Sequence, residues 1–315
     1  MKILITGSRG FMGGSVGRYA ARAGHEVLGI GRSSQPVADW PGRYIQADVV
    51  QADLSGIIAE FAPDALVHAA GSASVGGSMS APLDDLRASV LAWANTVDGV
   101  RRSGRKPLVV FPSSAAVYGN PVRLPVPEEA PIASISPYGY HKAACELLAR
   151  EYAACFGLNI LVCRFFSVFG ETQRRLLIWD LYTQFAAPDP VVWLQGTGQE
   201  ARDYLYVEDA ATAVLALAAD RSRVCRSGEC VVVNIASGEE ISVRDVAGQI
   251  RALVAPEKEI RCRGLARPGD PRRWCADISR LRSLAASWRP RSFPLTLKAC
   301  IAAWQARSET SSCGV

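Results

Sequence analysis

Long apolar runs are missing from this 315-residue sequence. The best stretch, around Ala210–Ala219, holds about ten residues, whereas a membrane-spanning helix needs roughly 18. Met1–Ile5 leads straight into glycine-rich sequence, without the longer apolar stretch and cleavage site of a secretory signal. We therefore expect no membrane partner and a cytoplasmic location.

Residues for disulfide or metal chemistry are also sparse. The nine cysteines are odd in number and include no Cys-x-x-Cys pair, which argues against a disulfide framework and a zinc site. With only three histidines and no carboxylate cluster at ligand spacing, we expect no metal. The 49% apolar and 21% charged residues are typical of a globular protein with a sizeable core.

Lysine is scarce too: it supplies only five of the 35 basic residues, so the net charge of +5 is largely due to arginine. Arginine favours bidentate contact with phosphate, which points to nucleic acid or to a small phosphorylated ligand. The arginines are spread along the chain, and no aromatic-basic RNA motif occurs. Composition alone does not choose between these partners.

Short apolar runs are present where long ones are missing. They lie at residues 2–6, 27–30, 65–68, 108–111, 160–163 and 231–234. Continuous apolarity suits strands that are buried on both faces, and segments of helical length lie between them: Phe11–Ala23, Pro82–Arg102 and Pro137–Phe156. The alternation predicts an α/β fold, a doubly wound parallel Rossmann sheet.

The alternation loosens after about residue 166, and proline and arginine become frequent between Val254 and Pro294. We expect residues 1–166 to form the Rossmann domain, with about 200–236 packing back on it. Residues 167–199 and 237–315 are expected to form a smaller C-terminal substrate-binding lobe that covers the ligand edge of the sheet.

A glycine loop follows the first expected strand. Gly7, Gly10 and Gly13 surround Phe11 and Met12 at the start of the first helix. Glycines here allow a tight turn and let the backbone N–H groups of a helix N-terminus approach a pyrophosphate. A simple turn is the alternative, but the strand-turn-helix context favours a dinucleotide site.

The second expected strand indicates which dinucleotide binds. A carboxylate at its end normally binds the ribose 2′-hydroxyl of NAD, but Gly31 occupies that position and Arg32 follows. Arg9, Arg32 and Ser33 offer donors to a 2′-phosphate, so NADP(H) is favoured over NAD(H). The alternative is that Arg32 is a solvated surface residue.

Asp48 and Val49 follow the expected third strand. A carboxylate there is placed to accept a hydrogen bond from the adenine amine. A turn-forming aspartate is an equal alternative.

Three residues predict proton transfer. Tyr138 and Lys142 are four apart in a helix that begins at Pro137, so the phenol and the ammonium share one helix face. The positive charge favours phenolate, which lets Tyr138 exchange a proton near neutral pH. Ser114 follows the fourth apolar run at the ligand edge, where its hydroxyl can hydrogen-bond the same carbonyl as the tyrosine.

With these motifs in order, the sequence resembles the extended short-chain dehydrogenase/reductases of the NAD-dependent epimerase/dehydratase family, which act on nucleotide sugars. The resemblance covers nearly the whole chain and includes the glycine loop, His68–Ala70, Ser114–Gly119, Tyr138 with Lys142, Arg164–Gly170, Arg202–Asp209 and Arg267–Asp270.

The resemblance implies a role for each residue. Tyr138 is the acid/base, Lys142 binds the nicotinamide ribose, and Ser114 orients the sugar. Further cofactor contacts are Ala69, Ala70, Gly71 and Phe165, and the substrate contacts are Ser74, Ser114, Tyr138, Ser167, Arg202, Arg267 and Asp270. Arg202, Arg267 and Asp270 would hold the nucleotide diphosphate and its ribose. The alternative for Arg202 is an ion pair with Asp203 or Glu208.

The resemblance also implies the partners. A nucleotide-diphosphate sugar and a dinucleotide account for the arginines, so we expect no nucleic acid. Pro82–Arg102 and Pro137–Phe156 resemble the helices that pair in the family's homodimers, so we expect a homodimer.

Departures from the family pattern narrow the reaction. Family dehydratases and decarboxylases carry an Asp-Glu pair or a glutamate after the catalytic hydroxyl, where this chain has Ala115 and Ala116. A methyl group cannot move a proton, so 4,6-dehydration and decarboxylation are not expected. Ser89 and Ser167 each replace an asparagine common in the family, which leaves the nucleotide open.

Two reactions are then compatible with the sequence. A 4-epimerase oxidises and re-reduces one carbon with a tightly bound NAD(P), whereas a reductase of a nucleotide-linked 4-keto(-6-deoxy) sugar consumes NADPH. Ser113–Gly119 resembles the epimerases, but Gly31 and Arg32 favour the reductase. We therefore expect NADP-dependent reduction with Tyr138 as proton donor. The alternatives are the 4-epimerase and, more distantly, a non-catalytic NADP-binding sensor on the same fold.

Overall fold

The computed structural model describes residues 1–264 and 271–312. Its central sheet has seven strands in the order β10-β6-β5-β4-β1-β2-β3, and all neighbours are parallel. These strands are β1 (Lys2–Thr6), β2 (Glu26–Gly31), β3 (Arg43–Gln46), β4 (Ala65–His68), β5 (Leu108–Ser114), β6 (Asn159–Phe165) and β10 (Cys230–Ile235). The strand order reverses between β1 and β4, so the predicted doubly wound Rossmann fold is confirmed.

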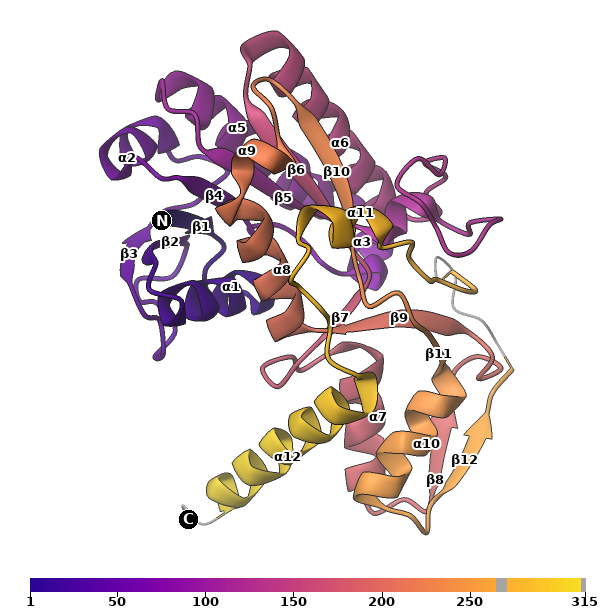
Figure 1. Cartoon of the computed structure of the whole chain (residues 1–315). Helices are drawn as coiled ribbons and strands as arrows, with labels where there is room; N and C mark the ends of the chain where they lie inside the picture. Colours follow the sequence, from indigo (N-terminus) through magenta and orange to yellow (C-terminus); the bar gives the residue numbers. More distant parts are fainter. Residues whose placement is uncertain (265–270, 313–315) are drawn as a thin grey trace.

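Helices cover both faces of this sheet (Figure 1). On one face α1 (Phe11–Arg22) packs against α8 (Val207–Ala219), and on the other lie α2 (Leu54–Phe61), α5 (Ala92–Arg102) and α6 (Pro137–Phe156). Within β1, Ile3 and Ile5 join the first core and Leu4 joins the second. Because both faces are buried, the strands read as continuous apolar runs.

The segment 82–102 is not one regular helix. It consists of α4 (Pro82–Leu86), a π-helical turn η1 (Arg87–Leu91) and α5. A π turn inserts an extra residue and so changes which side chains face inward. Buried Ser89 lies in this turn, and its Oγ accepts a hydrogen bond of 3.4 Å from the N–H of Ser72. The short helix α3 (Val75–Ser80) was not predicted.

The rest of the described chain forms a smaller lobe, which Figure 1 shows beyond the ligand edge of the sheet. A three-stranded sheet has the order β11-β9-β7, and a second sheet pairs β12 with β8. The elements are β7 (Ser167–Phe169), β8 (Val191–Leu194), β9 (Ala201–Tyr206), β11 (Glu240–Ser242), β12 (Glu259–Cys262), α7 (Leu176–Ala186), α10 (Val243–Val254) and α12 (Phe293–Ser312). A third apolar core, which includes Tyr182, Ile250 and Trp304, joins them.

The chain crosses between these two parts several times. After β9, helix α8 returns to pack on α1, and β10 extends the central sheet beside β6. The short helices α9 (Arg221–Val224) and α11 (Ser279–Leu284) also lie on the sheet half, α11 against β10 (Figure 1). The domain limits expected from the sequence stay a prediction.

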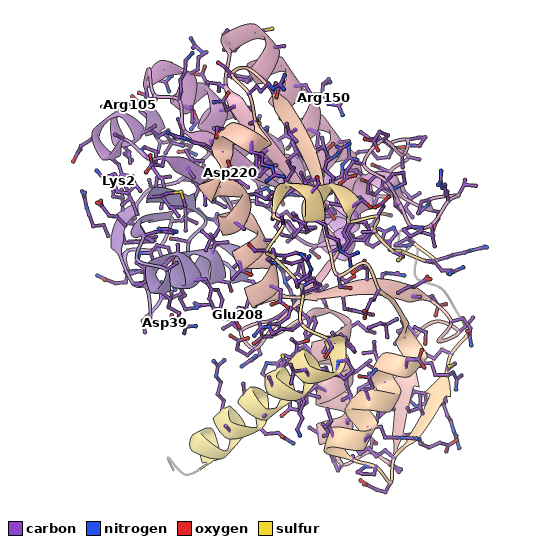
Figure 2. All side chains as sticks on the ribbon, in the orientation of Figure 1. Lys2, Asp39, Arg105, Arg150, Glu208 and Asp220 are labelled. Atoms are coloured by element: carbon purple, nitrogen blue, oxygen red, sulfur yellow. The ribbon has the colours of Figure 1, made fainter. Side chains whose placement is uncertain are left out.

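Charged side chains of both signs lie around the periphery of the sheet half. Figure 2 shows Lys2, Asp39, Arg105 and Arg150 there, whereas Asp220, at the end of α8, lies within the outline of the sheet half in this view. Within the described residues, no helix is both long and apolar enough to cross a bilayer.

Candidate active site

The glycine loop is packed too tightly for any side chain. Gly7 has a φ of +66°, and a methyl group on it would lie 2.5 Å from the backbone nitrogen of Ala70. A methyl group on Gly13 would lie 2.5 Å from the carbonyl oxygen of Gly7. Helix α1 follows Gly10 and has no side-chain cap, so the backbone N–H groups of its first turn can serve a ligand. This cradle fits a dinucleotide pyrophosphate.

Tyr44 of β3 fills the space where a carboxylate would bind the adenosine ribose. A methyl group on Gly31 would lie 2.8 Å from the Tyr44 hydroxyl oxygen, and that hydroxyl donates a 2.7 Å hydrogen bond to the carbonyl of Ser33. Tyr44 was not among the residues predicted for this site. Its signal is a large aromatic residue directly opposite Gly29 on the neighbouring strand.

The arginines expected at the 2′-phosphate lie on the same rim. Arg9 donates to the carbonyl oxygens of Gln35 and Pro36, the latter at 2.9 Å. Arg32 is exposed, and its carbonyl accepts a 3.1 Å hydrogen bond from the amide nitrogen of Gln46. Arg9 therefore also orders the loop that follows Arg32.

The adenine side is shaped by the turn after β3. Asp48 Oδ1 accepts a 3.0 Å hydrogen bond from the N–H of Val50, as a turn-forming aspartate does. The carbonyl of Val49, whose side chain is buried, accepts a 2.8 Å hydrogen bond from the Asn95 amide. This turn is thereby fixed to α5.

Ser114 ends β5 at the ligand edge and begins the short 3₁₀ helix η2 (Ala115–Tyr118). Its Oγ accepts a 3.1 Å hydrogen bond from the N–H of Ala116. This bond fixes the oxygen and leaves the hydroxyl proton to be donated to a ligand. Ser114 lies opposite Phe165 in the register of β5 and β6, which places the expected cofactor contact Phe165 next to it.

Tyr138 and Lys142 occupy the first two turns of α6. The Lys142 ammonium lies 5.7 Å from the centre of the Tyr138 ring, and it donates a 2.7 Å hydrogen bond to the carbonyl of Pro112. Pro112 is two residues before Ser114, so Lys142 fixes α6 to the end of β5. The structure thus brings the three predicted catalytic residues to one edge of the sheet.

A contact from α3 reaches Tyr138, the predicted acid/base. The backbone N–H of Tyr138 donates a 3.0 Å hydrogen bond to Oγ of buried Ser78. Ser74 begins the same helix, and its Oγ accepts a 3.0 Å hydrogen bond from Gly77. The sequence did not reveal that α3 links the expected substrate residue Ser74 to Tyr138.

Two of the other expected substrate residues, Ser167 and Arg202, lie in the lobe. Ser167 starts β7 opposite Tyr204. In β9, Arg202 donates to the carbonyl of Arg272 at 3.3 Å, and its guanidinium lies 5.4 Å from the centre of the Trp274 ring. Arg267 and Asp270 lie outside the described residues.

The two carboxylates considered as partners of Arg202 have other contacts. Asp203 accepts hydrogen bonds from the backbone N–H and the hydroxyl of Ser237, at 2.8 and 2.7 Å. Glu208 pairs with Arg291 at 2.7 Å.

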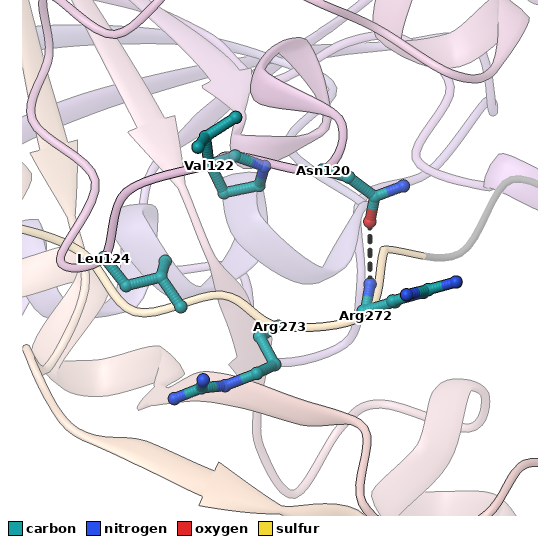
Figure 3. Close-up of a pocket in the computed structure, with 6 residues that line it drawn as sticks. Asn120, Val122, Leu124, Arg272 and Arg273 are labelled. Carbon is teal, nitrogen blue, oxygen red and sulfur yellow. Dashed lines mark hydrogen bonds between the residues drawn. The ribbon is translucent and has the colours of Figure 1, made fainter.

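A cavity of about 400 Å³ opens beside Arg272 (Figure 3). Its lining comes from the loop after η2 and from the segment that leads from the lobe back to α11: Asn120, Pro121, Val122, Leu124, Arg272 and Arg273. Asn120 Oδ1 accepts a 2.8 Å hydrogen bond from the N–H of Arg272. The cavity therefore lies between the loop that follows the catalytic strand and the arginines of the lobe.

Known proteins resemble this chain in sequence and in structure. Residues 3–236 match the NAD dependent epimerase/dehydratase family. The chain belongs to this family. The family match confirms the resemblance found in the sequence, and the chain is an enzyme of the extended short-chain dehydrogenase/reductase type.

Relatives extend over nearly the whole chain. A UDP-glucose 4-epimerase of Azospirillum brasilense is 30% identical over 313 residues, covering 92% of this chain and 87% of the relative. A UDP-glucose 4-epimerase of Mycolicibacterium smegmatis is 27% identical over 305 residues, covering 92% and 94%. The solved structure of MoeE5 in complex with UDP-glucose and NAD is 27% identical, has a TM-score of 0.85 and covers 98% of this chain and 99% of that one.

Proposed function

We propose that this protein is a nucleotide-sugar 4-epimerase with a bound nicotinamide dinucleotide. The relatives at full length include proteins named UDP-glucose 4-epimerase, and they favour this reaction over the reductase that the sequence favoured. A nucleotide-diphosphate hexose is the proposed substrate.

The observation that carries the proposal is the set of proton-transfer groups beside the ligand edge. It contains the Ser114 hydroxyl, the Tyr138 phenol and the Lys142 ammonium, while Ala115 and Ala116 are buried directly after Ser114. One acid/base suffices for epimerisation, because the proton removed from the sugar hydroxyl is the one returned. Elimination of water needs a second group, which these alanines do not supply.

The chain's residues divide the work as follows. Tyr138 takes the proton of the sugar C4 hydroxyl and later returns it, while the Ser114 hydroxyl donates a hydrogen bond to the same sugar oxygen and keeps its proton. Lys142 holds a positive charge beside the phenolate and the nicotinamide ribose. A bound nicotinamide supplies hydride exchange at the sugar carbon. Arg202 is placed to contact the diphosphate from the lobe.

Incubation of the purified protein with UDP-glucose and NAD or NADP tests the proposal. We expect slow conversion to the C4 epimer, measured by chromatography, with no net change at the nicotinamide absorbance band. Loss of NADPH on a nucleotide 4-keto-6-deoxyhexose, without epimerisation, would instead identify the reductase. Tight dinucleotide binding with neither reaction on a panel of nucleotide hexoses would favour the sensor.

The residues around the expected adenosine ribose favour NADP. Because a reductase would consume NADPH, this preference also keeps the reductase as the second candidate. Tyr44 stands where the ribose-binding carboxylate of an NAD site would be, and exposed Arg32 lies next to it. A charge-assisted contact to a 2′-phosphate contributes about 1.5–3 kcal/mol. We therefore expect calorimetry to show NADP binding at least about tenfold more tightly than NAD.

An arginine variant sharpens this test. Arg32→Gln is expected to remove most of the preference for NADP while NAD binding stays unchanged. The matched control is Arg43→Gln. Arg43 is also an exposed arginine, but it lies at the start of β3, whereas Arg32 contacts Gln46 at the end of that strand. Tighter binding of NAD by the unaltered protein would contradict the assignment.

The homodimer also remains a proposal. Exposed apolar side chains lie on helices that pack together: Leu83 of α4 is 56% exposed and Leu147 of α6 is 68% exposed. Such side chains on adjacent helices fit a second copy of the chain. We expect sedimentation to show a dimer that Leu147→Glu dissociates, whereas Leu253→Glu, on α10 of the lobe, leaves it intact.

A further inference from the structure

A buried ion pair lies beside the catalytic residues. Glu146 of α6 and Arg164 of β6 have side chains that are 1% and 2% exposed, and they make two contacts, Nη2 to Oε2 at 2.7 Å and Nε to Oε1 at 2.9 Å. We propose that this pair is a positioning unit that sets the separation between Ser114 and Tyr138. The inference rests on the catalytic roles given above and adds residues that touch no reacting atom.

The carboxylate joins the catalytic helix to the catalytic strand. Tyr138, Lys142 and Glu146 follow one another at intervals of four residues, so they lie on one face of α6. Ser113 donates a 2.6 Å hydrogen bond to Oε1 of Glu146. Because Ser113 immediately precedes Ser114, one carboxylate fixes both elements.

The guanidinium fixes the chain on the other side of Ser114. Arg164 Nη1 donates a 2.8 Å hydrogen bond to the hydroxyl of Tyr118, the last residue of η2. That hydroxyl donates to Oδ1 of Asn234 on β10 at 2.7 Å. Burial raises the pKa of Tyr118 to about 12, so the phenol keeps the proton that it donates. Ser114 is thus flanked by two buried side chains bonded to the same ion pair.

Stability alone does not account for the pair. Removing two charges from water costs several kcal/mol per ion, so apolar replacement of a buried ion pair is often neutral or stabilising. The pair instead holds its neighbours in a defined geometry, because charge-assisted hydrogen bonds have preferred lengths and angles. These bonds join Ser113, Glu146, Arg164 and Tyr118. A misplacement of about 1 Å at reacting groups can cost about a hundredfold in rate.

Two variants test the proposal without touching the reacting groups. Ser113→Ala cuts the link from Glu146 to the strand, and we expect kcat to fall about tenfold while KM changes less than about twofold. Glu146→Met with Arg164→Met removes both charges at similar volume, so the protein should fold and bind dinucleotide while kcat falls about a hundredfold. The control is Thr296→Val, which removes a buried hydroxyl of α12 that donates to Ser292 at 3.1 Å, and its kcat should stay unchanged.

A crystal structure of the double variant provides a measurement that does not depend on activity. We expect the distance between Ser114 Oγ and Tyr138 Oη to change by about 1 Å. A folded double variant with an unchanged distance, or with the kcat of the unaltered protein, would overturn the positioning role. If the unaltered protein epimerises no nucleotide sugar, the proposed function fails, and the distance comparison still decides the positioning role.

Discussion

The two parts of the molecule hold their polar residues in different ways. In the sheet half, the predicted catalytic residue Lys142 donates to the Pro112 carbonyl, and Glu146, on the same helix, is paired with Arg164 away from solvent. In the lobe, the ion pairs Arg261–Glu259 and Arg273–Glu240 have arginines that are 52% and 61% exposed. Exposed pairs also occur on the surface of the sheet half, as in Arg43 with Glu60. The sheet half therefore fixes the chemistry, whereas the lobe presents arginines that a ligand can engage.

The largest effect is expected from the catalytic tyrosine. Tyr138→Phe keeps the ring but removes the group that exchanges the proton, so kcat should fall about a thousandfold or more. Dinucleotide affinity and the melting temperature should change little. Tyr152→Phe on the same helix is the matched control. Substantial activity in Tyr138→Phe would exclude the mechanism and leave the fold assignment intact.

The corresponding change in the lobe should alter binding rather than rate. Arg202→Met keeps much of the side-chain length over the Trp274 ring but removes the charge. We expect KM for the nucleotide sugar to rise about ten- to a hundredfold with kcat changing much less. Arg261→Met, also in the lobe, should leave both constants unchanged. An equal loss in kcat would place Arg202 with the catalytic residues.

The same contrast explains what the sequence could reveal. The sheet strands, the glycine loop and Tyr138 with Lys142 follow from local patterns, because continuous apolar runs and a four-residue spacing lie within single elements. Lobe strands such as β7, with three residues, and β8, with four, pair with distant segments. β7 is too short to show a period, and β8 alternates between buried and more exposed residues over only four positions, so neither gives a comparable local pattern.

The site residues that the sequence did not reveal matter because of contacts between different helices and strands. Tyr44 matters because of Gly31 on the neighbouring strand, and Ser78 because of the Tyr138 backbone. Ser113 and Arg164 are opposite each other in the register of β5 and β6, a relation that appears only once the strands are paired. The relatives favour the 4-epimerase, which Ser113–Gly119 resembles, over the reductase that Gly31 and Arg32 favour.

Acid should destabilise the sheet half in particular, since the buried His68 lies there. Burial, with a smaller effect from the Lys142 charge, lowers the pKa of His68 from 6.5 to about 3. The unfolded state therefore binds a proton that the folded state does not, and stability falls as the pH drops below about 6.5, by about 2 kcal/mol at pH 5. Urea unfolding at pH 5 and at a pH above about 6.5 measures this loss of stability.

A histidine variant assigns that acid sensitivity. His68→Gln should reduce the difference between the two pH values by most of the expected amount. In the control His25→Gln the difference should be nearly unchanged, because His25 is far less buried. An unchanged pH dependence in His68→Gln would show that other groups control acid unfolding.

The smallest effect is expected from an exposed ion pair of the lobe, set against its buried counterpart. Glu240→Gln removes the charge that pairs with exposed Arg273, whose guanidinium stays solvated, so the melting temperature should move by about 2 °C or less. Glu146→Gln, in contrast, removes the negative charge that pairs with buried Arg164. Because the arginine charge then stays buried without an opposite charge, the free energy of unfolding should fall by about 3–5 kcal/mol. Calorimetric melting of both variants measures the difference. Equal shifts would mean that burial does not separate the two parts of the molecule, because the same chemical change would then cost the same in water and in the core.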